Sequence, residues 1–295
     1  MPPTPAPDLS ASRGTNEEPL LQGILDHLLA AKGFDASQYK RNYIKRRIAV
    51  RMRATGASTY EEYNRILKLK KEEAGLLLDR LTIHVTGFFR DPAVFRALKE
   101  RFFSRPLENG PFRVWSAGCS TGEEAYSTAI ALKDWALEHP PFPFEIWATD
   151  IDSQSVGAAE RARYPVAALG KMDRAHQSRW FYVQQEKAVV AEDLKKHVRF
   201  RTHDLLGDWP LDLARFDLIL CRNVLIYMTA PQQQILYERF AQSLVAGGFL
   251  VLGLTETLMG KARNLYQCVD VRHRIYRTLL VDPTKEDAKV EESLG

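Results

Sequence analysis

Apolar residues recur at helical spacing through the first part of the chain. Between residues 20 and 29 they fall at steps of one, three and four, and Ile44, Ile48 and Met52 follow at four-residue steps. Such spacing places apolar side chains on one face of a helix, and no alternating pattern typical of a strand interrupts it. We therefore predict a small all-helical domain over residues 19–81.

The pattern changes after a connecting segment at residues 82–95. Short apolar runs typical of buried strands then alternate with amphipathic helical stretches over residues 96–281. This alternation predicts an α/β fold with a doubly wound, Rossmann-like parallel sheet. The expected strands lie at 113–117, 144–151, 198–202, 216–221, 249–254 and 267–279, of which the last forms either one long strand or a pair. The expected helices lie at 123–137, 152–163 and 232–244, the last of them ended by Gly247-Gly248.

One stretch does not fit the alternation. Two short β-like runs, Trp180–Val183 and Ala188–Val190, are separated by the polar residues QQEK. We predict a small antiparallel β insertion over residues 178–200. The two ends of the chain, residues 1–18 and 282–295, are polar and lack an apolar period, and we predict them to be disordered.

Composition excludes several classes of protein. With 41 Lys and Arg against 37 Asp and Glu, the formal net charge is +4, which excludes a polycation built to coat nucleic acid. Three cysteines without a CxxC pair give neither a disulfide framework nor a zinc signature. No segment resembles a signal peptide, and no apolar run approaches the roughly 20 residues of a membrane span. We expect a cytoplasmic protein without a metal and without direct insertion into membranes.

The first candidate site is the turn after the strand at residues 113–117. Gly118 and Gly122 allow a ligand to approach the backbone closely, but the spacing is not the GxGxxG of dinucleotide-binding proteins. Glu123 stands at the start of the next helix, where it would repel a phosphate and attract a cation. This favours a cationic ligand over NAD or ATP, although a plain turn with an acidic first helical turn would have the same pattern.

Polar residues also follow the later strands. Asp150 ends the second strand, where a carboxylate of a doubly wound fold holds the two hydroxyls of a ribose. Asp204 and the pair Arg222-Asn223 each follow another strand. Because ligands bind at the carboxyl edge of such a sheet, we predict one site there. The glycine turn, Glu123 and Asp150 together fit S-adenosylmethionine.

Five segments, taken in order, resemble a known family. They are LTIHVTGFFRD, RVWSAGCSTGEEAYS, WATDID, HDLL and FDLILCRNVLIYM. From about Leu20 to Leu280 the chain is similar to the CheR-type chemotaxis receptor methyltransferases. The resemblance implies transfer of a methyl group from S-adenosylmethionine to glutamate side chains of chemoreceptors, forming glutamyl methyl esters and S-adenosylhomocysteine. It also implies the fold predicted above, with its helical domain and β insertion.

The same resemblance implies roles for individual residues. Arg90, near the cofactor carboxylate, and Tyr227, which would orient the substrate carboxylate, are the candidates for a part in catalysis. The family commonly has Asn where this chain has His84, which leaves a cofactor contact at that position open. The cofactor residues are His84, Thr86, Arg90, Gly118, Glu123 for the amino group, Asp150 for the ribose, Asp204 and Leu205 for the adenine, and Arg222 and Asn223 beside the sulfonium.

The near-neutral net charge conceals a basic helix. Residues 40–53 contain seven basic residues and no acid, and the stripe of Ile44, Ile48 and Met52 would turn toward the helical domain and leave the charges in water. Receptor methylation segments are acidic helices, so the resemblance makes this face a docking surface for them. The seven residues are Lys40, Arg41, Lys45, Arg46, Arg47, Arg51 and Arg53, and charge reversal at Arg46, Arg47 and Arg51 is expected to raise the KM for receptor.

The β insertion leads to a prediction about tethering. Family members that bind a receptor's C-terminal pentapeptide have a glycine-containing loop there, whereas the turn at residues 183–187 lacks glycine. We expect a pentapeptide-independent monomer that binds no nucleic acid. Two other functions stay open: a methyltransferase for a small molecule or RNA, and a module that binds cofactor or receptor without turnover.

Overall fold

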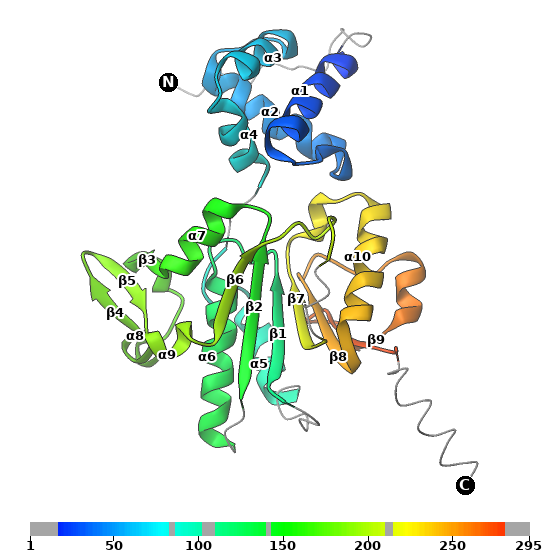
Figure 1. Cartoon of the computed structure of the whole chain (residues 1–295). Helices are drawn as coiled ribbons and strands as arrows, with labels where there is room; N and C mark the ends of the chain where they lie inside the picture. Colours follow the sequence, from blue (N-terminus) through cyan, green and yellow to red (C-terminus); the bar gives the residue numbers. More distant parts are fainter. Residues whose placement is uncertain (1–16, 83–85, 102–109, 140–142, 210–214, 281–295) are drawn as a thin grey trace, which may run out of the picture. The chain divides into compact units, whose positions relative to one another are not determined.

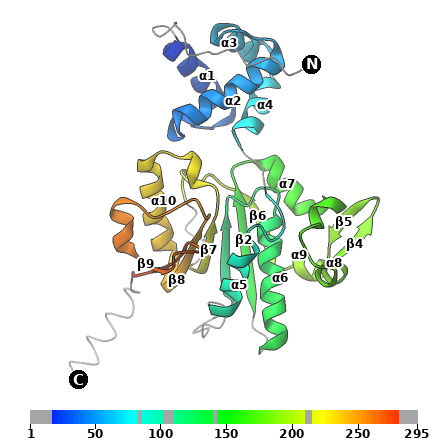
Figure 2. The same ribbon diagram turned by 180° about the vertical axis from the view of Figure 1, so that it is seen from behind.

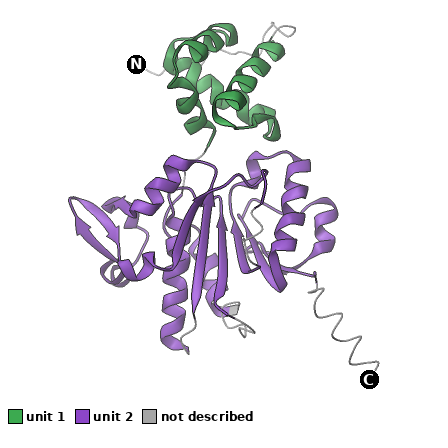
Figure 3. Cartoon of the chain, in the orientation of Figure 1, with its two compact units in different colours: residues 1–82 green, residues 83–295 purple. Residues whose placement is uncertain are grey.

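The computed structural model describes residues 17–82, 86–101, 110–139, 143–209 and 215–280 (Figure 1). The chain forms two compact units, residues 1–82 and 83–295, which are described separately (Figure 3). His84 and nearly all of the two predicted disordered ends lie outside the described residues. The exceptions are Glu17 and Glu18, predicted to be disordered, which form the start of the first helix.

The first unit is all helical, as the apolar spacing predicts. Leu21, Ile24 and Leu28 are fully buried on one helix, and Ile44 and Ile48 on the next. The first helix packs against the third and fourth, and the second against the fourth. The elements are α1 (Glu17–Lys32), a short 3₁₀ turn η1 (Ala36–Gln38), α2 (Arg41–Thr55), α3 (Tyr60–Leu69) and α4 (Glu73–Leu81).

The second unit is built on a seven-stranded sheet of order β6-β2-β1-β7-β8-β10-β9. In this order, β6, β2, β1, β7 and β8 are parallel, as predicted. The remaining two strands, β10 and β9, form an antiparallel hairpin at one edge of the sheet. Their apolar side chains are buried because helices cover the sheet. The strands are β1 (Phe112–Ala117), β2 (Phe144–Asp150), β6 (Val198–Thr202), β7 (Phe216–Cys221), β8 (Leu244–Leu252), β9 (Tyr266–Asp270) and β10 (Ile275–Thr278).

Helices connect the parallel strands and pack on the sheet (Figure 2). The helix after β1 contacts β2, the helix after β2 contacts β2 and β6, and the helix before β8 contacts β8. An additional helix, which the sequence pattern did not predict, packs on the helix after β1. The elements are α5 (Pro92–Arg101), α6 (Glu123–Glu138), α7 (Ser153–Arg161) and α10 (Ala230–Ser243), with 3₁₀ turns η3 (Leu225–Tyr227) and η4 (Gly260–Leu265).

A small antiparallel sheet of order β3-β5-β4 lies between β2 and β6 in the sequence. The predicted strand pair is present as β4 (Phe181–Gln184) and β5 (Lys187–Val190), but β3 (Arg163–Pro165) precedes the range 178–200. Three short elements complete this β-subdomain. They are η2 (Val166–Leu169), α8 (Arg174–Trp180) and α9 (Glu192–Lys195).

The interpretation of Gly247-Gly248 as a helix end is wrong. Helix α10 ends at Ser243 and β8 begins at once, so both glycines lie inside the strand. Gly247 has φ +67°, and a side chain on Gly248 would come within 3.1 Å of the Phe216 carbonyl oxygen. The glycines therefore serve the irregular pairing of β8 with β7 and not the helix.

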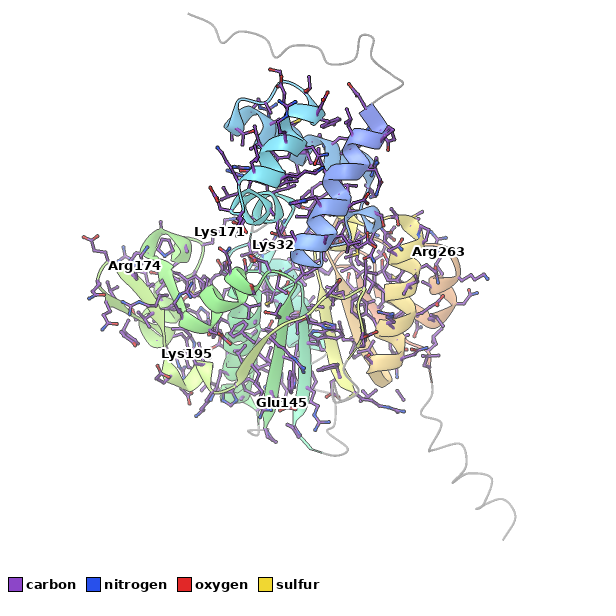
Figure 4. All side chains as sticks on the ribbon, turned by 45° about the horizontal axis from the view of Figure 1, so that its top comes forward. Lys32, Glu145, Lys171, Arg174, Lys195 and Arg263 are labelled. Carbon is purple, nitrogen blue, oxygen red and sulfur yellow. The ribbon has the colours of Figure 1, made fainter. Side chains whose placement is uncertain are left out.

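Charged side chains such as Arg174 and Arg263 are exposed on the outside of the second unit (Figure 4). None of the helices in the described part of the chain has the length and apolarity needed to cross a membrane. Within the same residues, no group of three His, Cys, Asp or Glu side chains is arranged to hold a metal ion.

Candidate functional site

The turn after β1 packs closely against the turn after β7. Gly118 and Cys119 donate backbone hydrogen bonds to the Thr149 carbonyl at 2.8 and 2.9 Å, which fixes the turn to the end of β2. Gly118 has φ +81°, and a Cβ there would lie 2.4 Å from a methyl group of Val224. Only glycine satisfies both conditions, so Gly118 brings two strand ends together at the carboxyl edge of the sheet.

Gly122 has a packing role. It precedes α6 with φ +92°, and a Cβ there would lie 2.8 Å from the Ala159 side chain and 3.0 Å from the Phe200 ring. The glycine therefore lets the start of α6 approach α7 and β6. This contact fixes the position of the residue that follows, Glu123.

Glu123 is a buried carboxylate, only 7 % exposed. The Thr121 hydroxyl donates a hydrogen bond to Glu123 Oε2 at 2.6 Å. Within the described residues, no cationic side chain forms an ion pair with Glu123. Burial raises the pKa of Glu123, and the hydrogen bond from Thr121 offsets this only in part. A buried carboxylate of this kind is suited to receive an ammonium group from a ligand.

Asp150 links the ends of β1 and β2. Its Oδ2 accepts a hydrogen bond from the Ser120 N–H at 2.7 Å, and its Oδ1 accepts one from the Asp152 N–H at 3.0 Å. The carboxylate is therefore fixed in direction at the tip of β2. This is the position predicted for a group that accepts hydrogen bonds from a ribose.

The guanidinium of Arg222 is held by the protein itself. The side chain is 1 % exposed and donates to Asp91 Oδ2 at 2.7 Å, to the Arg90 carbonyl at 2.9 Å and to Glu124 Oε2 at 3.2 Å. The contact of Arg222 with the sulfonium, which the family resemblance implies, stays a prediction. The Nη1 and Nη2 atoms of Arg222 brace the FFRD segment (residues 88–91) against β7 and α6, while its Nε has no partner within the described residues.

The FFRD segment has two residues in left-handed backbone conformation. Phe89 has φ +49° and Asp91 has φ +56°, both uncommon for residues with a side chain. The Phe89 N–H donates to the Ser127 hydroxyl at 2.8 Å, which ties the segment to α6. The two predicted cofactor residues here, Thr86 and Arg90, are half-buried on the same segment.

The loop after β6 carries the residues predicted for the adenine. Asp204 Oδ1 accepts a hydrogen bond from the Leu206 N–H at 2.9 Å, and Leu205 is buried. The Leu205 carbonyl accepts a hydrogen bond from the Trp209 indole at 2.7 Å, and Arg239 of α10 donates to the Gly207 carbonyl at 2.8 Å. Trp209 and Arg239 therefore brace this loop. No motif in the sequence singles them out.

The turn after β7 contains Asn223 and leads into η3, where Tyr227 is half-buried. Asn223 has φ +61°, and its N–H donates to Glu256 Oε2 at 2.8 Å. Glu256 comes from the segment after β8 and was not among the predicted residues. A single Glu in the run GLTETL has no spacing that signals a site.

Four buried polar atoms near this edge have no hydrogen-bond partner within the described residues. They are Ser120 Oγ, His203 Nε2, Arg222 Nε and Asn223 Oδ1. Buried polar atoms normally have partners, so these atoms are suited to a polar ligand. With Glu123 for an ammonium group and Asp150 for a ribose, the residues present fit S-adenosylmethionine.

The seven basic residues between Lys40 and Arg53 have different surroundings. Arg41 and Lys45 both pair with Glu18, while Arg51, 14 % exposed, makes a two-pronged ion pair with Glu73 at 2.9 and 2.7 Å. Arg51 is therefore engaged inside the helical unit, and its part in docking a receptor helix stays a prediction. Lys40, Arg46 and Arg53 are exposed, and Arg47 lies over the Tyr43 ring.

Comparison with known proteins gives consistent matches. Residues 19–82 match the family model "CheR methyltransferase, all-alpha domain", and residues 84–275 match "CheR methyltransferase, SAM binding domain". A chemotaxis protein methyltransferase of Listeria innocua is 35% identical over 78% of this chain and 87% of that protein. Chemotaxis protein methyltransferase 2 of Pseudomonas aeruginosa is 32% identical over 81% and 86%, and a probable chemotaxis protein methyltransferase of Rhizobium etli is 29% identical over 83% and 95%.

Proposed function

Because the chain belongs to the CheR methyltransferase family, we propose that it methylates glutamate side chains in the cytoplasmic helical region of chemoreceptors. The chain is an S-adenosylmethionine-dependent chemotaxis protein methyltransferase; the proposal concerns its acceptor. The observation that supports it most is the buried carboxylate of Glu123, together with the Asp150 carboxylate that the Ser120 N–H fixes at the tip of β2. These residues fit a cationic cofactor that brings an activated methyl group, and a glutamate carboxylate is already an anion at neutral pH.

The reaction makes few demands on the protein. S-Adenosylmethionine supplies a methyl group on a sulfonium, so a carboxylate oxygen forms the new C–O bond while the C–S bond breaks, leaving a neutral thioether. No proton has to be removed from the acceptor. The chain's own residues must therefore hold the reacting groups in line and exclude water, which accounts for roughly 7–11 kcal/mol in well-aligned reactions.

Each side of the proposed site has a separate task. Glu123 binds the ammonium end of the cofactor, Asp150 accepts hydrogen bonds from the ribose, and the loop at Asp204 and Leu205 lines the adenine. The segments that carry Arg90 and Tyr227 are held by Arg222 and by Glu256. We propose that Arg90 and Tyr227 face the cofactor carboxylate and the acceptor carboxylate, respectively.

The function is tested with purified protein, S-adenosylmethionine labelled on its methyl group, and a cytoplasmic receptor fragment. We expect label in the fragment that mild base releases as methanol, because esters hydrolyse in base. Replacing the acceptor glutamates by alanine should remove the label. Absence of transfer to the fragment, or a base-stable product, would contradict the proposal.

The exposed basic side chains of α2 support a docking surface for the acidic receptor helix. The double substitution Arg46→Glu, Arg53→Glu is expected to raise the KM for receptor about tenfold, since charge complementarity across such a face sets encounter and register. The affinity for S-adenosylhomocysteine should stay the same. Steady-state kinetics with the receptor fragment and calorimetry with S-adenosylhomocysteine measure the two effects.

A matched control comes from the same unit. Arg65→Glu, Lys68→Glu on α3 makes the same change of charge at two exposed positions of a different helix. We expect this control to leave the KM close to the wild-type value. An equal rise in both double variants would mean that net charge, and not the α2 face, decides receptor binding.

The β-subdomain supports a further expectation about tethering. Gln185 and Glu186 form the turn between β4 and β5 with φ +48° and +57°, so the turn closes without glycine. We propose that the chain is pentapeptide-independent and predict no measurable binding of a receptor C-terminal pentapeptide by calorimetry. Binding in the micromolar range would contradict this.

A further inference from the structure

Glu256 is a buried carboxylate whose hydrogen bonds all join segments of the backbone. It is 4 % exposed, and it lies in the segment after β8. Its Oε2 accepts hydrogen bonds from the N–H groups of Gly253 at 2.6 Å and Asn223 at 2.8 Å, and its Oε1 accepts one from Ile226 at 3.2 Å. No cationic side chain within the described residues forms an ion pair with it.

These bonds connect two strand ends at the carboxyl edge of the sheet. Gly253 follows β8, whereas Asn223 and Ile226 belong to the turn and the 3₁₀ segment after β7. A Cβ at Gly253 would lie 2.6 Å from Glu256 Oε2 and 2.8 Å from the Asn223 nitrogen, so the packing leaves no room for a side chain. The hydrogen bond from the Asn223 N–H to this carboxylate therefore holds Asn223 in its left-handed conformation.

We propose that Glu256 is a positioning residue for methyl transfer, holding the segment from Asn223 to Tyr227 in the geometry that the reaction needs. The inference rests on the proposed function, because that segment carries the residues assigned to the cofactor and to the acceptor carboxylate. Misplacement of reacting groups by about 1 Å can cost on the order of 100-fold in rate. Glu256 itself touches neither ligand in this assignment.

The buried position of Glu256 also shifts the pKa of its carboxyl group. Burial raises the pKa of its carboxyl above the ordinary value of 4.5, and the backbone N–H groups offset this in part. The neighbouring ionisable groups, Cys221 on β7 and Tyr237 on α10, have pKa values raised by burial, so both are neutral in mildly acidic solution. Protonation of Glu256 would place a hydrogen where the backbone offers another and weaken the turn.

The test uses the full chain carrying Glu256→Gln. A glutamine has one acceptor oxygen, so at least one of the three N–H groups would face an amide NH₂ and lose its bond. We expect kcat on the receptor fragment to fall about 100-fold, while the Kd for S-adenosylhomocysteine rises less than tenfold. Glu238→Gln, an exposed carboxylate on α10, is the matched control and should leave both values unchanged.

The pH profile separates positioning from simple destabilisation. In the wild type, kcat should fall as the pH decreases through the raised pKa of Glu256, above 4.5. In Glu256→Gln that limb should move to lower pH, where the acceptor glutamates themselves gain protons. An unchanged kcat, an unmoved limb, or loss of S-adenosylhomocysteine binding in proportion to kcat would overturn the inference. A wild type inactive on the receptor fragment would instead contradict the proposed function.

Discussion

Glu123→Gln is expected to weaken the binding of S-adenosylhomocysteine about 100-fold. The carboxylate is buried and forms no ion pair within the described residues. Its attraction to an ammonium group of the ligand would therefore be screened little by solvent and weakened by no competing cation. A charge-assisted hydrogen bond of this kind contributes about 1.5–3 kcal/mol, and 100-fold corresponds to about 2.7 kcal/mol. Calorimetric titration of the purified chain with S-adenosylhomocysteine measures the effect.

The same substitution should not destabilise the fold. Because the pKa of Glu123 is raised in the folded state, ionisation of this carboxyl opposes folding, and stability decreases as the pH increases through that pKa. Glutamine removes this penalty and keeps an acceptor for the Thr121 hydroxyl. The thermal midpoint without cofactor should therefore stay constant or rise at neutral pH.

Substitution of the adjacent Glu124 is expected to lower the stability of the fold, unlike Glu123→Gln. Glu124→Gln weakens the ion pair with Arg222, whose guanidinium is 1 % exposed, and leaves Asp91 as the remaining carboxylate partner. Since Asp91 still compensates the charge, the loss corresponds to a hydrogen bond between charged groups, about 1.5–3 kcal/mol, so the midpoint should fall. If the two variants lost stability and affinity to the same extent, the assignment of Glu123 to the cofactor would be wrong.

This contrast shows how far the sequence alone can define the site. Gly118, Glu123 and Asp150 could be assigned to one edge, because the carboxyl ends of parallel strands meet there. The choice of Glu123 over Glu124 for the ligand rests on the family resemblance and not on the residue pattern, since neighbouring helical positions point about 100° apart and the rotation of a helix depends on its packing. One of the contacts that sets this rotation is the close approach of Gly122 to Ala159 in α7, where a Cβ on residue 122 would lie 2.8 Å from the alanine side chain.

Long-range contacts account for what the sequence pattern did not predict, namely the ion-pair partners of Arg222 and the position of Glu256. Arg222 bonds to Asp91 and Glu124, and Glu256 bonds to Asn223, across separations that no local periodicity encodes. Gly247-Gly248 was misinterpreted for a related reason. Glycine adopts a positive φ both after a helix and inside an irregular strand, and only the pairing of β8 with β7 distinguishes the two.

Arg51→Ala is expected to destabilise the helical unit by about 3 kcal/mol, because it leaves the carboxylate of Glu73 buried at 3 % exposure without its cation. Only the hydroxyl of Tyr63, which donates to Glu73 Oε1 at 2.8 Å, would remain of the hydrogen bonds that the side chain now accepts. The five tryptophans all lie beyond residue 82, so their fluorescence reports the second unit. Hydrogen exchange of peptides from α2 and α4 in the intact chain therefore measures the loss.

The pH dependence identifies Glu73 as the cause. Burial acts to raise the pKa of Glu73, but the hydrogen bonds from Arg51 and Tyr63 prevail and lower it. The ionised Glu73 therefore stabilises the fold fully above pH 4.5, and this stabilisation is lost as the pH falls through the lowered pKa. Without Arg51, burial prevails and protonation stabilises the variant. The difference from the wild type should therefore narrow as the pH is lowered below 4.5. Arg46→Ala, at an exposed position of the same helix, should change neither exchange nor its pH dependence; a similar loss there would show that helix propensity, and not the buried ion pair, is responsible.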